Sequence, residues 1–473
     1  MVPEGRVART DLGRRSKECP ATMSGIFKAY DVRGVVPDEL NGEIAFAIGR
    51  AFARALGPRR VVVGRDMRLS SEELASAFAD GLVVEGVDVV DLGLCSTDML
   101  YFASGRLDAH GAMVTASHNP GSYNGIKFCG PGAAPIGVET GLAEIEALVE
   151  QGLAPVSASG ARGARTTDNL LDAYVHHVLS FVDASSLAGL RIVADTANGM
   201  GGLVVPAVFG ALDVELDVLY PELDGSFPNH PADPIQPENL IDLKARVLSQ
   251  GADIGLAFDG DADRVFLVDD RAAPVSGSTT TAIIARRMLE REPGATILYN
   301  LICSRAVPEI IREQGGVPIR TRVGHSFIKA EMARTGAIFA GEHSGHYYFR
   351  ENYRADSGVI GAVNVLEELA RAGVELSTLR KEYERYAASG EINSKVRDAN
   401  EVLAFVETAF AGEGRVDHLD GLTIDFPDWW FNLRASNTEP LLRLNLEART
   451  SDEVARRTQQ VLAVVAKAES RDA

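Results

Sequence analysis

Cysteine is scarce in this 473-residue sequence, and its spacing excludes two classes of protein. The four cysteines, Cys19, Cys95, Cys129 and Cys303, are widely separated and form no CxxC pair. A disulfide-stapled secreted domain needs a dense set of cysteines, and a structural zinc site needs them at close spacing. The pattern therefore predicts a reduced, cytoplasmic protein without a disulfide framework.

Long hydrophobic runs and an excess of basic residues are also missing. No apolar stretch approaches the ~18 residues that a membrane-spanning helix needs. The sequence has 47 Lys and Arg against 66 Asp and Glu, and its net charge is -19. This balance argues against binding to nucleic acid or to an anionic membrane. A phosphorylated small molecule would need a local basic pocket within this acidic surface.

The chain length and the order of apolar segments indicate several α/β units. At 473 residues the chain exceeds what a single hydrophobic core supports. Strand-like runs at 61–63, 111–114, 190–194 and 296–299 alternate with helix-like segments such as 71–84. This rhythm predicts an α/β protein of three related domains with mixed or parallel sheets, whose functional loops lie at the carboxyl ends of strands.

The segment beyond residue 390 differs, because short strand-like runs precede a helix expected over 452–467. It predicts a smaller α+β domain. The N-terminal residues 1–22 are Arg-rich and lack the apolar core of a secretory signal, which predicts a disordered tail. The expected domains are α/β domain I over 23–160, α/β domain II over 161–270, α/β domain III over 271–389 and α+β domain IV over 390–473.

The first polar cluster lies in MVTASHNPGSYNGIKF, residues 113–128. The Asn-Pro-Gly triplet at 119–121 forces a turn, which places Ser117 and His118 before the turn and Lys127 after it. A serine in this position is most often a cap or turn residue. The alternatives are a hydrolase nucleophile and a carrier of a transferred group, and the segment alone leaves all three open.

The second cluster, AFDGDADRVFLVD, places Asp259, Asp261 and Asp263 at alternate positions between two apolar runs. Carboxylates this close repel one another unless a cation neutralises them; a solvated acidic turn is the alternative. An EF-hand loop is excluded, because its sixth position is Arg264 instead of glycine and its twelfth is Asp270 instead of glutamate. Oxygen ligands without His or Cys favour Mg²⁺, and Arg264 suits a phosphoryl group beside it.

Two further clusters suit the binding of a sugar and of a phosphate. AGEHSGHYYF places polar groups at alternate positions, which suits recognition of sugar hydroxyls, with half a zinc site as the weaker alternative. LRASNTEPLLR combines an arginine with hydroxyl and amide groups, as a phosphate site requires, with a capped charged loop as the alternative. The residues are Glu342, Ser344 and His346 in the first cluster, and Arg434, Ser436, Asn437 and Thr438 in the second.

Cations for the expected basic pocket stand in three other segments. Arg33 and Arg65 precede expected helices, and RTRVGHSFIK contributes Arg320, Arg322 and His325.

The four motifs TASHNP, DGDADR, GEHSGH and RASNTEP occur in this order and at domain-sized intervals. On the basis of these motifs, the sequence resembles the α-D-phosphohexomutase superfamily, most closely its bacterial phosphomannomutase/phosphoglucomutase branch. The likeness runs from about Ile26 to the final helix, and DTANGMGG and DGSFPNHPADPIQPENL also look like the family's second domain. The resemblance implies four domains around a central cleft. It also implies interconversion of hexose 1-phosphate and hexose 6-phosphate, of mannose or glucose, through a phosphoserine enzyme and a hexose 1,6-bisphosphate.

The resemblance further implies roles for individual residues. Ser117 would carry the phosphoryl group, and Lys127 or His118 would handle the proton of the sugar hydroxyl. The residues expected to act in catalysis are Ser117, His118, Lys127, Arg33 and Arg264; those expected to hold one Mg²⁺ per chain are Asp259, Asp261, Asp263 and the phosphate on Ser117. Those expected to bind substrate are Tyr30, His325, Glu342, Ser344, His346, Arg434, Ser436, Asn437 and Thr438.

The expected partners are sugar phosphates, with hexose 1,6-bisphosphate as activator and intermediate. No nucleic acid or membrane partner is expected, and the chain is expected to be a monomer or a weak homo-oligomer.

The sequence departs from the family pattern at two places. Ile302 in NLICSR takes the place of a family lysine, whose charge Arg320 or Arg322 is expected to replace. The segment 96–98, Ser-Thr-Asp, replaces a common Pro-Thr-Pro and is expected to affect local packing more than chemistry.

Three other functions are alternatives to hexose mutase activity. A phosphoglucosamine mutase usually has glutamine at the position of His343, so GEHSGH favours the hexose type. A non-catalytic sugar-phosphate sensor would be expected to lose the serine or an aspartate, and all are retained. A serine hydrolase would need a G-x-S-x-G elbow, which does not surround Ser117.

Overall fold

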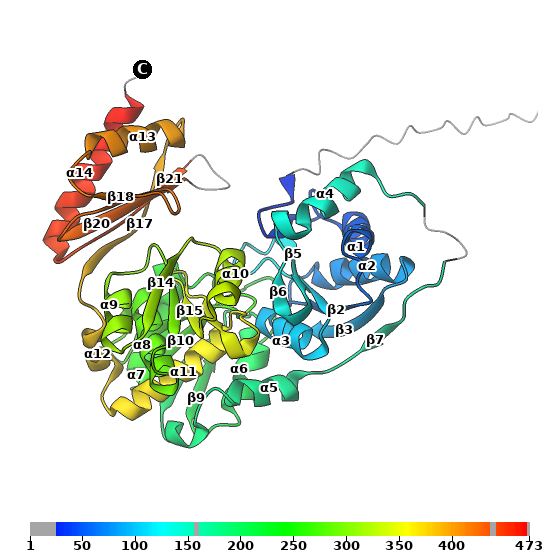
Figure 1. The fold of residues 1–473 in the computed structure, drawn as a ribbon. Helices are drawn as coiled ribbons and strands as arrows, with labels where there is room; N and C mark the ends of the chain where they lie inside the picture. Colours follow the sequence, from blue (N-terminus) through cyan, green and yellow to red (C-terminus); the bar gives the residue numbers. More distant parts are fainter. Residues whose placement is uncertain (1–24, 156–159, 436–440, 471–473) are drawn as a thin grey trace, which may run out of the picture.

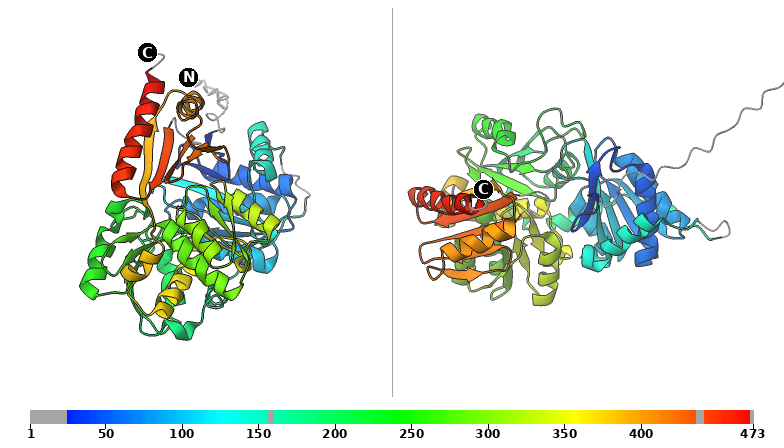
Figure 2. Two further views of the ribbon diagram at one scale, coloured as in Figure 1. Left: turned by 60° about the vertical axis from the view of Figure 1, so that its left-hand side comes forward. Right: turned by 90° about the horizontal axis from the view of Figure 1, so that it is seen from above.

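The computed structural model describes residues 25–155, 160–435 and 441–470, which form four sheets (Figure 1). We call the units built on these sheets domains I to IV. Domains II and III lie between domain I and domain IV (Figures 1 and 2). The expected tail over 1–22 lies outside the described residues, as do Ser436, Asn437 and Thr438. Among the described helices, none combines the length and apolar character that crossing a membrane needs.

Domain I is a mixed sheet in the order β1-β5-β4-β2-β3-β7, with β6 on β5. Val61 and Val63 face the layer of α1, α2 and α4, and Val62 faces α3, as the period-two alternation of a strand requires. The sheet extends past the expected boundary near 160, because β7 pairs with β3. The elements are β1 (Asp31–Val35), α1 (Gly42–Leu56), β2 (Arg60–Arg65), α2 (Ser71–Val84), β3 (Asp88–Leu94), α3 (Thr97–Leu107), β4 (His110–Val114), β5 (Tyr123–Gly130), β6 (Ala134–Pro135), α4 (Leu142–Gln151) and β7 (Arg165–Thr167).

Domain II has the strand order β12-β11-β10-β8-β9. The strands β9, β8 and β10 are parallel, and β10 then turns back into β11, with Phe258 opposite Val265. The acidic motif is this short connection at the carboxyl end of β10. The elements are α5 (Leu171–Leu179), β8 (Arg191–Asp195), α6 (Gly201–Phe209), β9 (Glu215–Leu219), α7 (Ile241–Gln250), β10 (Ile254–Phe258), β11 (Val265–Asp269) and β12 (Pro274–Val275).

Domain III has the strand order β14-β13-β15-β16. The hairpin of β15 and β16 pairs Gly341 with Tyr347 and carries the GEHSGH motif in its loop. The elements are α8 (Gly277–Arg291), β13 (Thr296–Asn300), α9 (Ala306–Glu313), β14 (Val317–Thr321), α10 (His325–Thr335), β15 (Phe339–Gly341), β16 (Tyr347–Phe349), α11 (Gly358–Ala372) and α12 (Leu376–Leu379).

Domain IV is an antiparallel sheet in the order β17-β21-β20-β19-β18, against which α13 and α14 pack. It is the α+β unit that the sequence predicts. The elements are β17 (Ala387–Lys395), α13 (Ala399–Ala409), β18 (Arg415–Asp417), β19 (Leu422–Asp425), β20 (Trp429–Ala435), β21 (Leu441–Ala448) and α14 (Ser451–Glu469). The expected α/β fold class, with three α/β domains and a smaller final domain, is confirmed.

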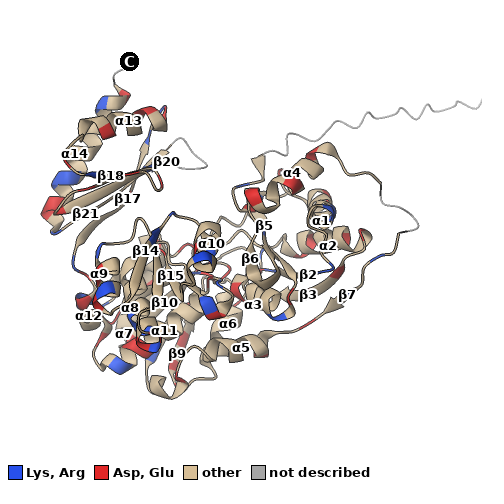
Figure 3. Ribbon diagram, in the orientation of Figure 1, with Lys and Arg blue, Asp and Glu red and all other residues tan. Residues whose placement is uncertain are grey.

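The hydrophobic core is divided unequally among the domains. One contiguous cluster joins Phe102 of domain I, Phe258 of domain II and Phe349 of domain III. Domain IV has a separate core around Phe431. Acidic residues stand on helices such as α2, α4 and α13 (Figure 3), and others, among them Asp98 and Asp259, are buried.

Asp98 adds a polar connection among the first three domains. It follows Ser96, the N-cap of α3, and accepts hydrogen bonds from Tyr174 Oη of domain II at 2.5 Å and from Ser357 Oγ of domain III at 2.6 Å. The neighbouring Thr97 donates from Oγ1 to Asp261 Oδ2 at 2.6 Å. The segment that replaces the family's Pro-Thr-Pro therefore joins three domains and also supports the acidic loop, which goes beyond the local packing effect that we expected.

Candidate active site

Ser117 lies in the connection from β4 to β5, directly beside the acidic loop of domain II. Its Oγ donates to Asp259 Oδ2 at 2.7 Å, and its backbone N donates to Thr115 Oγ1 at 2.9 Å. The residue is buried and has φ +52, a left-handed conformation that is unfavourable for a residue with a Cβ. Gly260 permits the close approach, since a Cβ there would lie 2.4 Å from Ser117 O. The hydroxyl is thus held against carboxylates.

The three carboxylates of the acidic loop converge as the sequence predicts. Asp259, Asp261 and Asp263 are buried, and each offers an oxygen within 4.8 Å of the others. Within the part of the chain that the structure describes, Asp261 Oδ1 and Asp263 Oδ1 are buried without a hydrogen-bond partner, so each has a lone pair for a ligand. Burial raises the pKa of Asp259 to about 7, against the opposing charge of Arg264. Such a cluster of hard oxygen ligands fits a divalent cation.

Arg264 connects the serine to the acidic loop. Its Nε donates to Asp259 Oδ2 at 2.9 Å, and its Nη2 lies 3.1 Å from Ser117 Oγ. The same Nη2 lies 2.5 Å from His118 Nδ1, which must accept because a guanidinium only donates. The Arg264 charge and burial together lower the pKa of His118 well below its ordinary value. His118 is therefore neutral, with the proton on Nε2.

Lys127 contacts the other side of the acidic loop. It lies on β5 and donates from Nζ to Asp261 Oδ2 and Asp263 Oδ2, both at 2.7 Å. Burial by itself would lower the pKa of Lys127, but these two carboxylates outweigh it and raise the pKa well above the ordinary value. A lysine held in the ammonium form supplies positive charge, and this geometry does not favour the expected role of Lys127 in accepting a proton.

His346 forms a second acid–base pair with Asp356, a residue that sequence analysis did not select. His346 Nδ1 donates to Asp356 Oδ2 at 2.8 Å, and a β-bridge pairs His346 with Arg264 across the boundary of domains II and III. Burial would lower the pKa of His346, but the carboxylates of Asp263 and Asp356 raise it. The hydrogen bond assigns the proton to Nδ1 and leaves Nε2 free to accept another.

A cavity of about 1190 Å³ brings most of the candidate residues together. Residues of domains I, II and III line it, and Tyr30 packs edge-on against His325 with ring centroids 5.0 Å apart. Burial lowers the pKa of His325 to about 3, so that its ring is neutral. The candidates in the lining are Tyr30, Arg33, Ser117, His118, Lys127, Asp263, Arg264, His325 and His346.

The three candidates of the GEHSGH loop, Glu342, Ser344 and His346, differ in whether they line the cavity. Glu342 is buried, where it accepts from Tyr348 Oη at 2.6 Å and from Asn300 Nδ2 at 3.2 Å. Gly345 has φ +85, and its N donates to Glu342 O at 3.2 Å, so the motif forms a turn. Of the three candidates His346 lines the cavity, and the binding of sugar hydroxyls by Glu342 and Ser344 stays a prediction.

Domain IV contributes none of the described residues that line this cavity. Arg434 lies on β20, where its Nη2 is 3.9 Å from Glu391 Oε2 and its Nε is buried without a hydrogen-bond partner among the described residues.

Three of the arginines expected in the basic pocket have partners outside the lining of this cavity. Arg65 pairs with Glu72 at 3.3 Å, Arg320 pairs with Asp417, and the Arg322 guanidinium lies 4.3 Å from the centroid of the Phe327 ring. Arg320 and Arg322 thus contact domain IV and domain III respectively, and the expectation that one of them replaces the charge of the family lysine stays a prediction.

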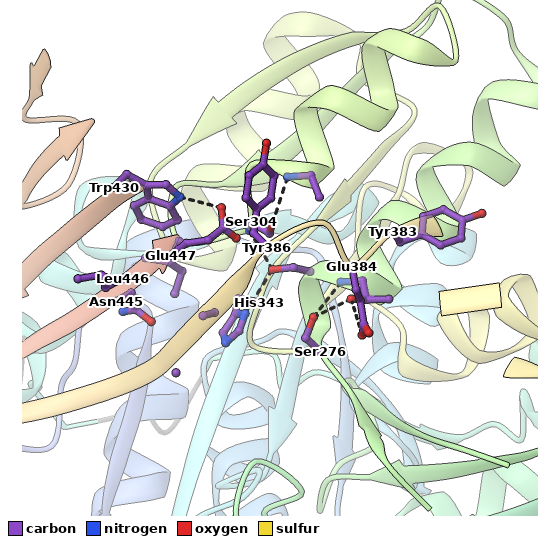
Figure 4. A pocket seen from close by; sticks show the side chains of 16 residues that line it. Ser276, Ser304, His343, Tyr383, Glu384, Tyr386, Trp430, Asn445, Leu446 and Glu447 are labelled. Atoms are coloured by element: carbon purple, nitrogen blue, oxygen red, sulfur yellow. Dashed lines mark hydrogen bonds between the residues drawn. The ribbon is translucent and has the colours of Figure 1, made fainter. Parts of the chain in front are cut away.

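A second pocket of about 230 Å³ lies between domains III and IV (Figure 4). His343 and Ile302 line it, together with Trp430, Asn445 and Glu447 of domain IV. His343 thus belongs to the lining of this pocket and not to the lining of the Ser117 cavity.

Arg68 is a further residue outside the set predicted from the sequence, although Arg65 of the same segment, VGRDMRLSS, is in that set. The Arg68 guanidinium is buried and donates to Ser117 O at 2.8 Å and to Asn119 O at 2.7 Å. The available signal is the Asp66-x-Arg68 pair directly after β2, since a charged pair following a buried strand is seldom exposed.

Family models cover nearly the whole described chain. The matches are phosphoglucomutase/phosphomannomutase alpha/beta/alpha domain I over residues 24–155, domain II over 172–272, domain III over 276–386 and the C-terminal domain over 391–464.

Individual relatives are similar over most of their length. The chain is 42% identical over 431 residues to the phosphomannomutase of Salmonella montevideo, covering 89% of this chain and 94% of the relative. It is 41% identical over 426 residues to the phosphohexose mutases protein of Xanthomonas campestris pv. campestris, covering 89% and 95%. A crystal structure of a phosphoglucomutase/phosphomannomutase family protein from Burkholderia thailandensis superimposes with a TM-score of 0.87 at 35% identity, covering 95% of this chain and 98% of that one.

Proposed function

Because the chain belongs to the phosphoglucomutase/phosphomannomutase family, we propose that it interconverts hexose 1-phosphate and hexose 6-phosphate through a phosphoserine at Ser117. It is a hexose-phosphate mutase with sugar phosphates as substrates. The observation that carries the residue assignment is Ser117 Oγ, which lies 2.7 Å from Asp259 and 3.1 Å from Arg264 on a cavity of about 1190 Å³.

Asp259, Asp261 and Asp263 would hold Mg²⁺, since two of their buried oxygens accept no hydrogen bond from any described residue. When bound, the ion would neutralise charge on the phosphoryl oxygens. Lys127 and Arg264 add positive charge on two sides of the same loop. These cations make the acidic surface compatible with an anionic substrate, because they lie inside the cavity.

The proton of the attacking sugar hydroxyl would go to His346 Nε2. The free ring nitrogen and the hydrogen bond from Nδ1 to Asp356 support this role over Lys127 and His118. The bond from phosphorus to the sugar oxygen forms as the bond to Ser117 Oγ breaks. Arg264 Nη2 is placed to stabilise the departing serine oxygen by a hydrogen bond, and that oxygen takes up a proton from water to become the hydroxyl. The product of this step is a hexose 1,6-bisphosphate, which also acts as the activator that phosphorylates the resting enzyme.

The bisphosphate would then turn end for end and return its other phosphate to Ser117. A site that serves both orientations must bind whichever phosphate is distal, and the segment of domain IV with Arg434, Ser436, Asn437 and Thr438 suits this task. Glu342 and Ser344 would bind sugar hydroxyls when domain IV approaches. We further propose a cytoplasmic monomer or weak homo-oligomer that binds no nucleic acid.

The test is a comparison of kcat/KM for mannose 1-phosphate, glucose 1-phosphate and glucosamine 1-phosphate, with Mg²⁺ and a trace of hexose 1,6-bisphosphate. We expect comparable values for the first two and a much lower value for the third. Preference for glucosamine 1-phosphate would instead identify a phosphoglucosamine mutase. No turnover of any of the three would contradict the mutase assignment.

A further inference from the structure

Four backbone carbonyls of the serine loop converge on one buried side chain. Arg68 Nη2 donates to Ser117 O at 2.8 Å and to Asn119 O at 2.7 Å. Arg68 Nη1 donates to Pro120 O at 2.8 Å and to Tyr123 O at 2.9 Å. A guanidinium presents these N–H groups in a fixed plane, so the four bonds fix the loop path from residue 117 to residue 123.

Asp66 in turn holds the Arg68 side chain in place. Its Nε lies 3.2 Å from Asp66 Oδ2, and Asp66 Oδ1 accepts from Arg68 N at 3.0 Å and from Ser71 Oγ at 2.5 Å. Arg68, Asp66 and Ser71 are all buried. Asn124, at the exit of the loop, donates from Nδ2 to Ser71 Oγ at 2.9 Å. The start of α2 and the serine loop are thus one hydrogen-bonded unit.

Domain II closes over the other face of the guanidinium. The Phe227 ring lies 5.2 Å from Arg68 Cζ, and a Cβ at Gly225 would lie 2.5 Å from Arg68 Cα. Gly260 of the acidic loop packs against Ser117 O, the same carbonyl that Arg68 binds. Arg68 therefore lies where the serine loop meets two segments of domain II.

We propose that Arg68 is the positioning residue that holds Ser117 in its left-handed conformation, with Oγ directed at the acidic loop. Its hydrogen bonds go to backbone oxygens, and none of those in the described structure reaches Ser117 Oγ, so Arg68 acts through the loop. Without it the carbonyls would be buried and unpaired, and the left-handed residue would relax toward a conformation that suits a Cβ. The inference rests on the proposed function of Ser117.

The test uses Arg68→Lys, which keeps the charge but cannot reach four carbonyls from one ammonium group. We expect kcat to fall about 10²-fold, the phosphorylation of Ser117 by hexose 1,6-bisphosphate to slow equally, and KM to stay within about threefold, since no substrate contact is removed. In Arg68→Ala, millimolar guanidinium should restore part of kcat, and methylammonium should not.

The matched control is Arg50→Lys. Arg50 is another buried arginine of domain I, bound to Glu85 Oε1 at 2.7 Å and to Ala154 O at 2.6 Å, away from the serine loop. It should lower the melting temperature about as much as Arg68→Lys and leave kcat unchanged. If Arg68→Lys does not fold, Ser71→Ala decides, with an expected loss in kcat of about fivefold from weaker support of Asp66.

The outcomes separate the inference from the proposed function. Wild-type protein that takes up no phosphate at Ser117 overturns both. A second outcome overturns only the role of Arg68. In it the wild-type protein is phosphorylated, and Arg68→Lys has the same kcat as the Arg50→Lys control. The same holds for Ser71→Ala where that variant decides. A loss carried by KM alone would also overturn it.

Discussion

The contacts that join domains I to III to one another differ in kind from those that join domain IV to domain III. The first three share one hydrophobic cluster and meet at buried polar contacts such as Asp98. Domain IV has its own core and contacts domain III through polar groups, among them Arg305 Nη2 with Trp429 O at 3.0 Å and Val323 N with Asp420 Oδ2 at 3.2 Å. Polar contacts at a boundary exchange for water more easily than a shared apolar core.

This difference matches the two tasks of the proposed reaction. Phosphoryl transfer needs in-line positioning, and its candidate residues Ser117, Asp261 and Arg264 are buried in domains I and II, which share a hydrophobic cluster. A reorienting bisphosphate needs a contact that can be made and released, and Arg434 stands on the separately built domain. The account predicts that changes in the first region reduce kcat and that changes in the second raise KM.

The largest expected effect is that of Ser117→Ala. Without the hydroxyl no phosphoenzyme forms, and we expect kcat to fall by about 10⁴-fold or more. Steady-state rates with glucose 1-phosphate measure the loss. Ser389→Ala, on strand β17 of domain IV, serves as a serine control outside the cavity. A Ser117→Ala variant with full activity would contradict the assignment.

Asp261→Asn tests the acidic loop with a smaller expected effect. The amide removes one anionic oxygen ligand and weakens the contact with Lys127, and kcat should fall about 10²-fold. In the wild type, Mg²⁺ at 100 times its Kd should add about 2.7 kcal/mol to the free energy of unfolding. A thermal melt with and without Mg²⁺ should show this gain in the wild type and its loss in the variant. The same gain in both proteins would place the ion elsewhere.

Arg434→Lys tests domain IV. A lysine cannot form the bidentate contact of an arginine with a phosphate, so KM should rise about tenfold while the rate of Ser117 phosphorylation stays near the wild-type value. Arg449→Lys is the control, because Arg449 is an exposed arginine of the same domain that pairs with Asp428. A fall in kcat without a change in KM would break the distinction between the two regions.

Asp98→Asn tests the junction of domains I to III through stability. Burial raises the pKa of Asp98 to about 6, although hydroxyls of Ser357, Ser96 and Tyr174 donate to it. A raised pKa means that the folded state binds the proton more tightly. The contribution of Asp98 is therefore full below pH ~4 and is lost as the pH rises through about 6.

Relative to Asp98→Asn, the wild type should lose about 2–3 kcal/mol of unfolding free energy between pH 4 and pH 7. Urea unfolding of both proteins across this range measures the difference. A difference that stays constant with pH would show that Asp98 does not titrate in the folded protein.

The sequence predicted the elements and the first polar clusters because these follow from local pattern. The helix expected over 71–84 is α2 (Ser71–Val84), and Asp259, Asp261 and Asp263 converge because β10 turns directly into β11.

Contacts between separate segments do not follow from local pattern in this way. Arg68 binds backbone carbonyls, which every sequence has, and Asp356 meets His346 because the chain turns back after β16 and pairs Asp356 with Tyr348. The placement of Glu342 and His346 depends on the left-handed Gly345, which turns the chain between them.

The central claim is that Ser117 carries a phosphate between two positions of a sugar. The most direct measurement is intact-mass analysis, followed by peptide mapping, of the protein after incubation with Mg²⁺ and a hexose 1,6-bisphosphate. The account predicts one added phosphoryl group, located on Ser117 and removed by excess hexose 1-phosphate. A protein that turns over substrate while Ser117 remains unmodified throughout would contradict it.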